Sequence, residues 1–104
     1  MNLTFIQTPM FVVQAARLKL TDEDVQALEQ LIMEFPERGN VMRQTGGIRK
    51  IRFAPPSWHT GKSGATRVCY VVFNAIDACY FVSVFAKNEK ANLSDKESDV
   101  ARVG

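Results

Sequence analysis

The sequence has little of what metal centres and disulfide frameworks are made from. It holds two cysteines, Cys69 and Cys79, and a single histidine, His59. Both cysteines fall in apolar, strand-like segments and have no second Cys or His pair at ligand spacing, so we expect buried core thiols rather than a zinc site or a disulfide. No cluster of carboxylates of the kind that holds magnesium is visible either. We therefore expect no metal and no cofactor.

Long apolar runs are also missing. None reaches the roughly 18 residues that a membrane span needs, and the opening Met1–Thr4 lacks the basic and apolar regions of a signal peptide. These absences predict a cytoplasmic protein with no membrane partner. The length of 104 residues and the hydrophobic content of 46% suit one modest core, so we expect residues 1–104 to form a single domain.

Acidic residues are scarce in the middle of the chain. Between residues 41 and 90 there are eight Lys/Arg and two acids, a net charge of +6, whereas residues 1–40 carry −3 and residues 91–104 carry −1. The overall charge of +2 thus hides a strongly basic segment. A concentrated basic surface is the electrostatic footprint of a protein that binds a polyanion.

The first forty residues predict a strand and two helices. Residues 3–6 favour a strand, and Thr8-Pro9 form an N-cap and first helical residue for a helix over 9–18. A second helix begins after Thr21 with three acids in its first turn, repeats apolar residues at three- and four-residue spacing, and stops at Pro36.

From Val41 the period of the pattern changes to two. Strands are expected over 48–53, 65–73 and 78–85, with Ile48, Lys50 and Arg52 on one side of the first of these. Ser94–Glu97 is a capping box that predicts a short C-terminal helix. The fold class is α+β: an N-terminal strand and two helices packed on a small, mainly antiparallel sheet, with a short C-terminal helix.

Four pieces of the basic segment resemble the RelE/HigB superfamily of bacterial type II toxins, most closely its HigB-like branch. They are Gly46–Arg52, Gly61–Ala65, Arg67–Val71 and Phe85–Glu89. The superfamily has Tyr-Tyr where this chain has Tyr70-Val71, and Tyr where it has Phe85. The resemblance implies a RelE-like fold and a ribosome-dependent messenger-RNA endoribonuclease that inhibits translation. Its partners would be a cognate antitoxin, the ribosome and messenger RNA.

The resemblance also implies a catalytic centre in which Lys50, Arg52 and Arg67 converge on one scissile phosphate. Guanidinium groups can hold two phosphate oxygens and stabilise the charge that develops as the phosphate is attacked. Lys50 is the first candidate for the base, provided that it loses its proton. Tyr70 is a further catalytic candidate, because it is the only hydroxyl left of the tyrosine pair. The alternative for these cations is a solvated, exposed sheet face.

Other residues are predicted to contact RNA. His59 is an alternative base, because imidazole titrates near neutral pH, and Trp58 beside it is placed to stack on an unpaired base. The remaining backbone contacts are assigned to Arg49, Lys62, Lys87 and Lys90. Lys62 lies in Gly61-Lys62-Ser63-Gly64, which is not a phosphate-binding P-loop, because residue 56 is proline where that motif has glycine.

Two other functions stay open at this point. One is a non-catalytic RNA-binding or partner-binding module that kept the basic surface. The other is a gyrase-directed toxin of the related ParE type, against which the Lys/Arg trio argues.

Overall fold

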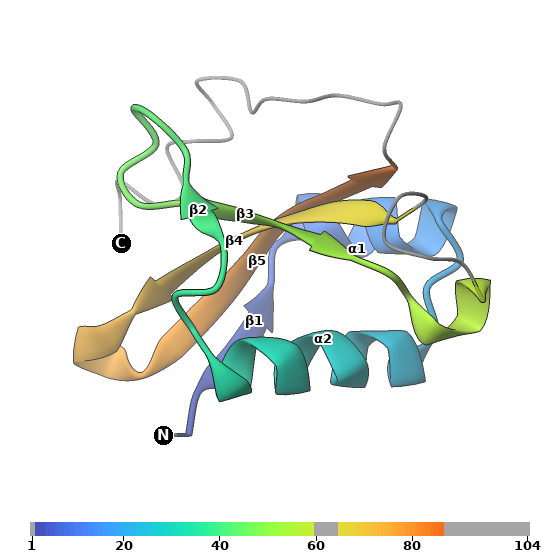
Figure 1. Ribbon diagram of the computed structural model, residues 1–104, viewed down its shortest axis with the longest axis horizontal. Coiled ribbons are helices and arrows are strands. Elements are labelled where there is room, and N and C mark those ends of the chain that lie inside the picture. Colours follow the sequence, from blue (N-terminus) through green and yellow to red (C-terminus); the bar gives the residue numbers. More distant parts are fainter. Residues whose placement is uncertain (1, 60–64, 87–104) are drawn as a thin grey trace.

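The computed structural model describes residues 2–59 and 65–86, and these form helices packed on one five-stranded mixed sheet (Figure 1). The strand order is β1-β5-β4-β3-β2. The elements in chain order are β1 (Thr4–Gln7), α1 (Pro9–Arg17), α2 (Asp22–Glu34), β2 (Asn40–Val41), β3 (Arg49–Phe53), the 3-10 turn η1 (Pro56–Trp58), β4 (Thr66–Phe73), the 3-10 turn η3 (Asn74–Ile76) and β5 (Ala78–Ala86).

Helix α2 covers one face of the sheet. It begins with a capping box in which the Thr21 hydroxyl accepts from Asp24 N at 3.1 Å and Asp24 Oδ2 accepts from Thr21 N at 2.9 Å. Its buried Leu28 and Ile32 join a core that includes Ile51 and other residues of β3, β4 and β5. This packing makes β3 amphipathic, because successive side chains of a strand alternate between the two faces.

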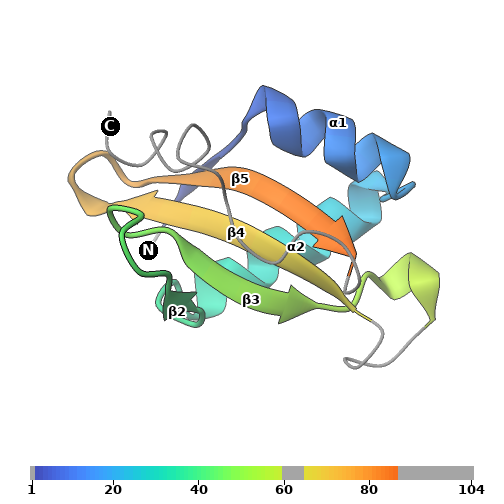
Figure 2. The same cartoon turned by 90° about the horizontal axis from the view of Figure 1, so that it is seen from above.

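Helix α1 lies alongside β5, beyond the end of the short strand β1 (Figure 2). Its N-cap Thr8 accepts from Phe11 N at 3.2 Å and donates to the carbonyls of Phe81 and Val82. Gln14 Oε1 accepts from Val84 N at 2.9 Å. Side chains of this helix and its cap therefore satisfy backbone groups of β5 at and beyond the end of its pairing with β1.

A second core lies on the face opposite α2. It consists of Ile48, Cys69, Val71, Val82 and Phe85, with Met42 and Tyr80 among the partly buried residues packed against it. Cys69 and Cys79 are both free, buried thiols, as expected from the sequence. Burial raises the pKa of Cys79 to about 12, with a smaller contribution from the charge of Glu29, so this thiol remains protonated at neutral pH.

The predicted α+β fold is confirmed, and the differences are local. β1 joins the sheet parallel to β5, whereas the other strand pairs are antiparallel. The two-residue strand β2 was not predicted, because a pair this short has no periodic pattern. The predicted C-terminal helix lies outside the described residues. The single-domain assignment of residues 1–104 remains a prediction.

Candidate active site

Two of the three basic side chains of β3, Lys50 and Arg52, lie on the face that α2 leaves uncovered. Ile51 and Phe53 point into the core under α2, and the alternation of the strand therefore sends Lys50 and Arg52 to the opposite face. This is the facing that the sequence predicts. Arg52 is exposed and Lys50 is half-buried.

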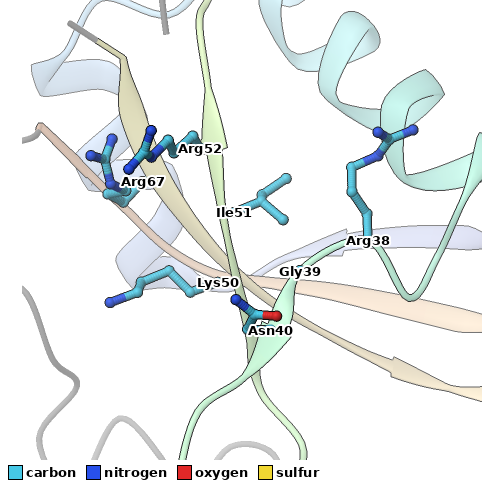
Figure 3. Close-up of a pocket in the computed structure, with 7 residues that line it drawn as sticks. All are labelled: Arg38, Gly39, Asn40, Lys50, Ile51, Arg52 and Arg67. Carbon is cyan, nitrogen blue, oxygen red and sulfur yellow. The ribbon is translucent and has the colours of Figure 1, made fainter. Parts of the chain in front are cut away.

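Arg67 lies directly opposite Arg52 on the neighbouring strand β4. Figure 3 shows the two side chains next to each other, with Lys50 on the same side of β3. Arg67 Nη1 donates to the carbonyls of Ala65 and Thr66, both at 3.4 Å. Like charges directly opposite in a sheet are destabilising. The pairing of Arg52 with Arg67 therefore does not stabilise the fold and indicates a binding surface.

The three predicted cations open onto one groove with a volume of about 580 Å³. Its lining residues are Arg38, Gly39, Asn40, Lys50, Ile51, Arg52 and Arg67. Within the described residues, neither Arg52 nor Arg67 forms an ion pair with a carboxylate. The groove is thus cationic and suited to a phosphodiester backbone.

One wall of the groove is the turn from Pro36 to Asn40, and Tyr70 fixes it from the α2 side of the sheet. The Tyr70 hydroxyl donates to Pro36 O at 2.8 Å and accepts from Gly39 N at 3.2 Å. Arg49 Nη1 donates to Gly39 O at 2.6 Å and to Glu37 O at 3.2 Å. Two side chains of the sheet therefore fix the backbone of a turn more than nine residues away in sequence.

Gly39 allows this wall to approach β3 closely. A Cβ atom at this position would lie 2.6 Å from Ile51 Cγ2 and 2.8 Å from Lys50 O. The second of these contacts is with backbone, which cannot rotate away. Glycine is therefore needed here for close approach rather than for a special backbone conformation.

Tyr70 does not line the groove, although the sequence analysis placed it among the catalytic candidates. Its side chain is fully buried in the core under α2, and burial raises the pKa of its hydroxyl above the ordinary value. Both hydrogen bonds of the hydroxyl go to the backbone of the wall. The geometry gives Tyr70 a positioning role.

Arg49 points away from Lys50 and Arg52, as its place in the strand requires. It forms a 3.8 Å ion pair with Glu37 and lines a second hollow of about 360 Å³. The other residues lining this hollow are Phe35, Pro36, Glu37, Val41, Gly47, Val72 and Asn74. The predicted RNA contact of Arg49 remains a prediction, and its observed partners are protein atoms.

Trp58 and His59 lie at the end of η1, and η1 is hydrogen-bonded to the start of α2. Asp24 Oδ1 accepts from Ser57 N at 2.9 Å, and Asp24 Oδ2 accepts from the Ser57 hydroxyl at 2.5 Å. Burial alone would raise the pKa of Asp24, but these hydrogen bonds and those from Thr21 hold it below its ordinary value. His59 is exposed, with a left-handed backbone at φ 51°, and neither residue lines the groove.

The other predicted RNA contacts, Lys62, Lys87 and Lys90, lie outside the described residues. The structure adds two groove residues that the sequence analysis missed, Arg38 and Asn40. Their only signal in the sequence is the turn Glu37–Asn40 after Pro36, which does not reveal that it folds against β3.

Residues 2–59 and 65–86 contain neither a cluster of metal ligands nor a membrane-spanning helix. No group of three or more His, Cys, Asp and Glu side chains there is arranged to hold a metal ion. Of the helices in that part of the chain, none has the length and apolar character required to cross a membrane.

The chain is similar to known proteins both in sequence and in fold. The sequence model of a family described as the RelE toxin of the RelE / RelB toxin-antitoxin system matches residues 6–103. Among solved structures, the free E. coli toxin RelE, in a form with two arginines replaced by alanine, superposes with a TM-score of 0.59. The alignment covers 99% of this chain and 97% of that one at 18% sequence identity, so this likeness concerns the fold.

Proposed function

The chain belongs to the RelE toxin family, and from this premise we propose that it is a ribosome-dependent endoribonuclease that cuts messenger RNA and inhibits translation. As a toxin of a toxin-antitoxin system, it has an antitoxin as its partner. Assignment to the HigB-like branch remains a prediction.

The observation that carries the proposal is the convergence of Lys50, Arg52 and Arg67 on one groove. Arg52 and Arg67 are cross-strand partners, and Lys50 is two residues from Arg52 on the same face of β3. A cluster of cations on rigid strands can grip a phosphate without reorganising during the reaction.

The reaction that these groups suit is transesterification of RNA. The ribose 2′-oxygen attacks the adjacent phosphorus, and the bond from phosphorus to the 5′-oxygen breaks. The products are a 2′,3′-cyclic phosphate and a 5′-hydroxyl. The proton of the 2′-hydroxyl passes to a base, and the departing 5′-oxygen takes up a proton from water. Extra negative charge develops on the phosphoryl oxygens, where Arg52 and Arg67 stabilise it.

We assign the base to Lys50 in the first instance, since it lies beside the arginine pair in the groove. A lysine accepts a proton only when it is neutral. His59 is the alternative base. No step of this scheme requires a metal ion, and we propose that the reaction is metal-independent. We propose that the reaction takes place in the cytoplasm, where the proposed substrate and the ribosome are found.

The experiment that tests this function is the mapping of transcript 5′ ends after brief induction of the chain in bacteria. The parent is expected to arrest growth and to create new 5′ ends within translated regions. Arg67→Ala is expected to abolish both effects. Arg17→Ala, which removes one positive charge from α1, is the matched control and should behave as the parent. Growth arrest without new 5′ ends would contradict the proposal.

A second candidate function is a non-catalytic RNA-binding module. The observation in its favour is that the Tyr70 hydroxyl is occupied by the backbone of the wall, which leaves the groove without a tyrosine from this position. Such a module would bind RNA through the same cations. It would protect transcripts from other nucleases or leave them intact, whereas the enzyme cuts them.

A further inference from the structure

We propose that Asn40 determines the sequence preference of cleavage by hydrogen-bonding a nucleobase next to the scissile phosphate. This inference rests on the proposed function, since it assigns the base contact of the same groove. It concerns a residue that neither the sequence motifs nor the family match single out.

Asn40 has the right place in the sheet for such a contact. It lies on the edge strand β2, where its register partner on β3 is Lys50. Opposed residues of an antiparallel pair share one face, with Cβ atoms about 5 Å apart. Asn40 is exposed and lines the groove together with Lys50, Arg52 and Arg67, and Figure 3 shows its amide beside β3 near Lys50.

The distance from Asn40 to the arginine pair suits a neighbouring base rather than the phosphate itself. Lys50 and Arg52 are two residues apart on β3, which is about 7 Å along a strand. When Arg52 and Arg67 hold a phosphate, Asn40 therefore lies further along the groove. From there its side chain can contact a base attached to the neighbouring backbone of the RNA. An uncharged side chain at this place adds little to phosphate binding, but it can form directional hydrogen bonds.

The backbone that carries Asn40 is held in position. Gly39, the preceding residue, is hydrogen-bonded through its amide to Tyr70 and through its carbonyl to Arg49. It is also pressed against Lys50 O and Ile51, where a Cβ atom would not fit. A side chain that selects a base must be fixed relative to the reacting phosphate, and these contacts fix the wall.

The chemistry of an amide indicates which base it would prefer. The side chain of Asn40 offers one acceptor oxygen and one donor nitrogen side by side. Adenine presents its amino group between two ring acceptors, so an amide can pair with it through two hydrogen bonds on either edge. We therefore expect an adenine next to the cleaved bond to be favoured by the parent protein.

The test compares the base frequencies at cleavage junctions for the parent and for Asn40→Ala and Asn40→Asp, by mapping 5′ ends after brief induction. Asn74→Ala, which changes an exposed asparagine in the turn between β4 and β5, is the control. The expected result is cleavage by all four proteins, with the adenine preference reduced by about 5- to 150-fold in both Asn40 variants and unchanged in the control.

Three results would overturn the inference. The first is a junction profile that is the same in the parent and in a folded Asn40 variant. The second is a parent that shows no adenine preference. The third is complete loss of cutting in both folded variants, which would place Asn40 in the reaction rather than in the choice of site. If the parent itself produces no new 5′ ends, the proposed function fails instead, and the two failures are thus distinguishable.

Discussion

At the scale of single residues, the side chains around the groove have two different roles. Lys50, Arg52 and Arg67 face the groove, whereas Tyr70 and Arg49 hold its wall from the other side of the sheet. This division follows from the alternation of strands. Arg49 and Lys50 are neighbours in sequence but point to opposite faces. A basic run on a strand is therefore not a basic patch, and only every second residue faces the groove.

Tyr70→Phe separates a positioning role from a catalytic one. Removing the hydroxyl leaves Pro36 O and Gly39 N without this partner in a buried place, which costs about 1–3 kcal/mol of folding stability. We expect a lower midpoint of thermal unfolding and a higher KM for cleavage, with a smaller change in kcat. The measurements are thermal unfolding and single-turnover kinetics on programmed ribosomes.

A different outcome would restore the catalytic role of Tyr70. If the variant is as stable as the parent and binds as well, but cleaves at least about 100-fold more slowly, the hydroxyl takes part in proton transfer. Phenylalanine keeps the ring that packs in the core, so loss of the fold is not expected.

His59→Gln tests which residue accepts the proton of the 2′-hydroxyl. If His59 is the base, the single-turnover rate on programmed ribosomes should fall by roughly 10²–10⁴-fold. Because His59 is exposed and does not line the groove, we expect a change of less than about threefold and assign the role to Lys50. A larger fall would transfer the role to His59.

At the scale of elements, Asp24 joins helix α2 to the turn η1. Its carboxylate is fully buried and accepts hydrogen bonds from Thr21 and Ser57. One side chain thus caps a helix and also forms hydrogen bonds with a turn more than thirty residues later in the chain. Thr21 and the acids of the first turn can be recognised in the sequence, but the contact between Asp24 and Ser57 is visible only in the folded chain.

The stability of the fold should depend on pH through Asp24. Its pKa is lowered in the folded state, so the unfolded chain binds the proton more readily. The contribution of this carboxylate to stability is therefore present above the ordinary value of 3.8 and lost as pH falls through the lower folded-state pKa. The free energy of unfolding of the Asp24→Asn variant should be about 1–3 kcal/mol lower than that of the parent at pH 7. On acidification, the stability of the variant should fall less than that of the parent. Urea unfolding at pH 7 and pH 3 measures both. An equal acid dependence in parent and variant would contradict this assignment.

At the scale of the whole molecule, the pattern of the sequence was enough for the α+β class, but not for every strand pairing. Thr8, Thr21 and Pro36 mark helix boundaries through local chemistry, and the structure has its helices at these places. The parallel pairing of β1 with β5 joins residues more than seventy positions apart, and no local pattern specifies it. The cations of the groove could be predicted, because they lie in recognisable strand patterns. The wall could not, because the contact of the turn with β3 is not specified by any local pattern.

Charge is also distributed unevenly over the whole molecule. Residues 1–40 carry −3 and residues 41–90 carry +6, so a partner that covers the basic groove should be attracted before contact. We expect association with the antitoxin, tested with the product of the neighbouring gene, to slow by about tenfold or more as salt rises from roughly 0.01 M to 1 M. Stopped-flow association measures this rate. A rate that does not depend on salt would show that the antitoxin binds elsewhere or without electrostatic attraction.

We propose that Arg52 and Arg67 form the cleavage centre, and the most direct test is the single-turnover rate of messenger-RNA cutting on programmed ribosomes. The parent, Arg52→Ala, Arg67→Ala and the control Arg17→Ala are compared after their folding is verified by thermal unfolding. We predict that each groove variant cuts at least about 100-fold more slowly, as expected when a group that stabilises developing charge is lost, and that the control matches the parent. Folded groove variants that cut within about threefold of the parent would show that cleavage does not depend on these two arginines.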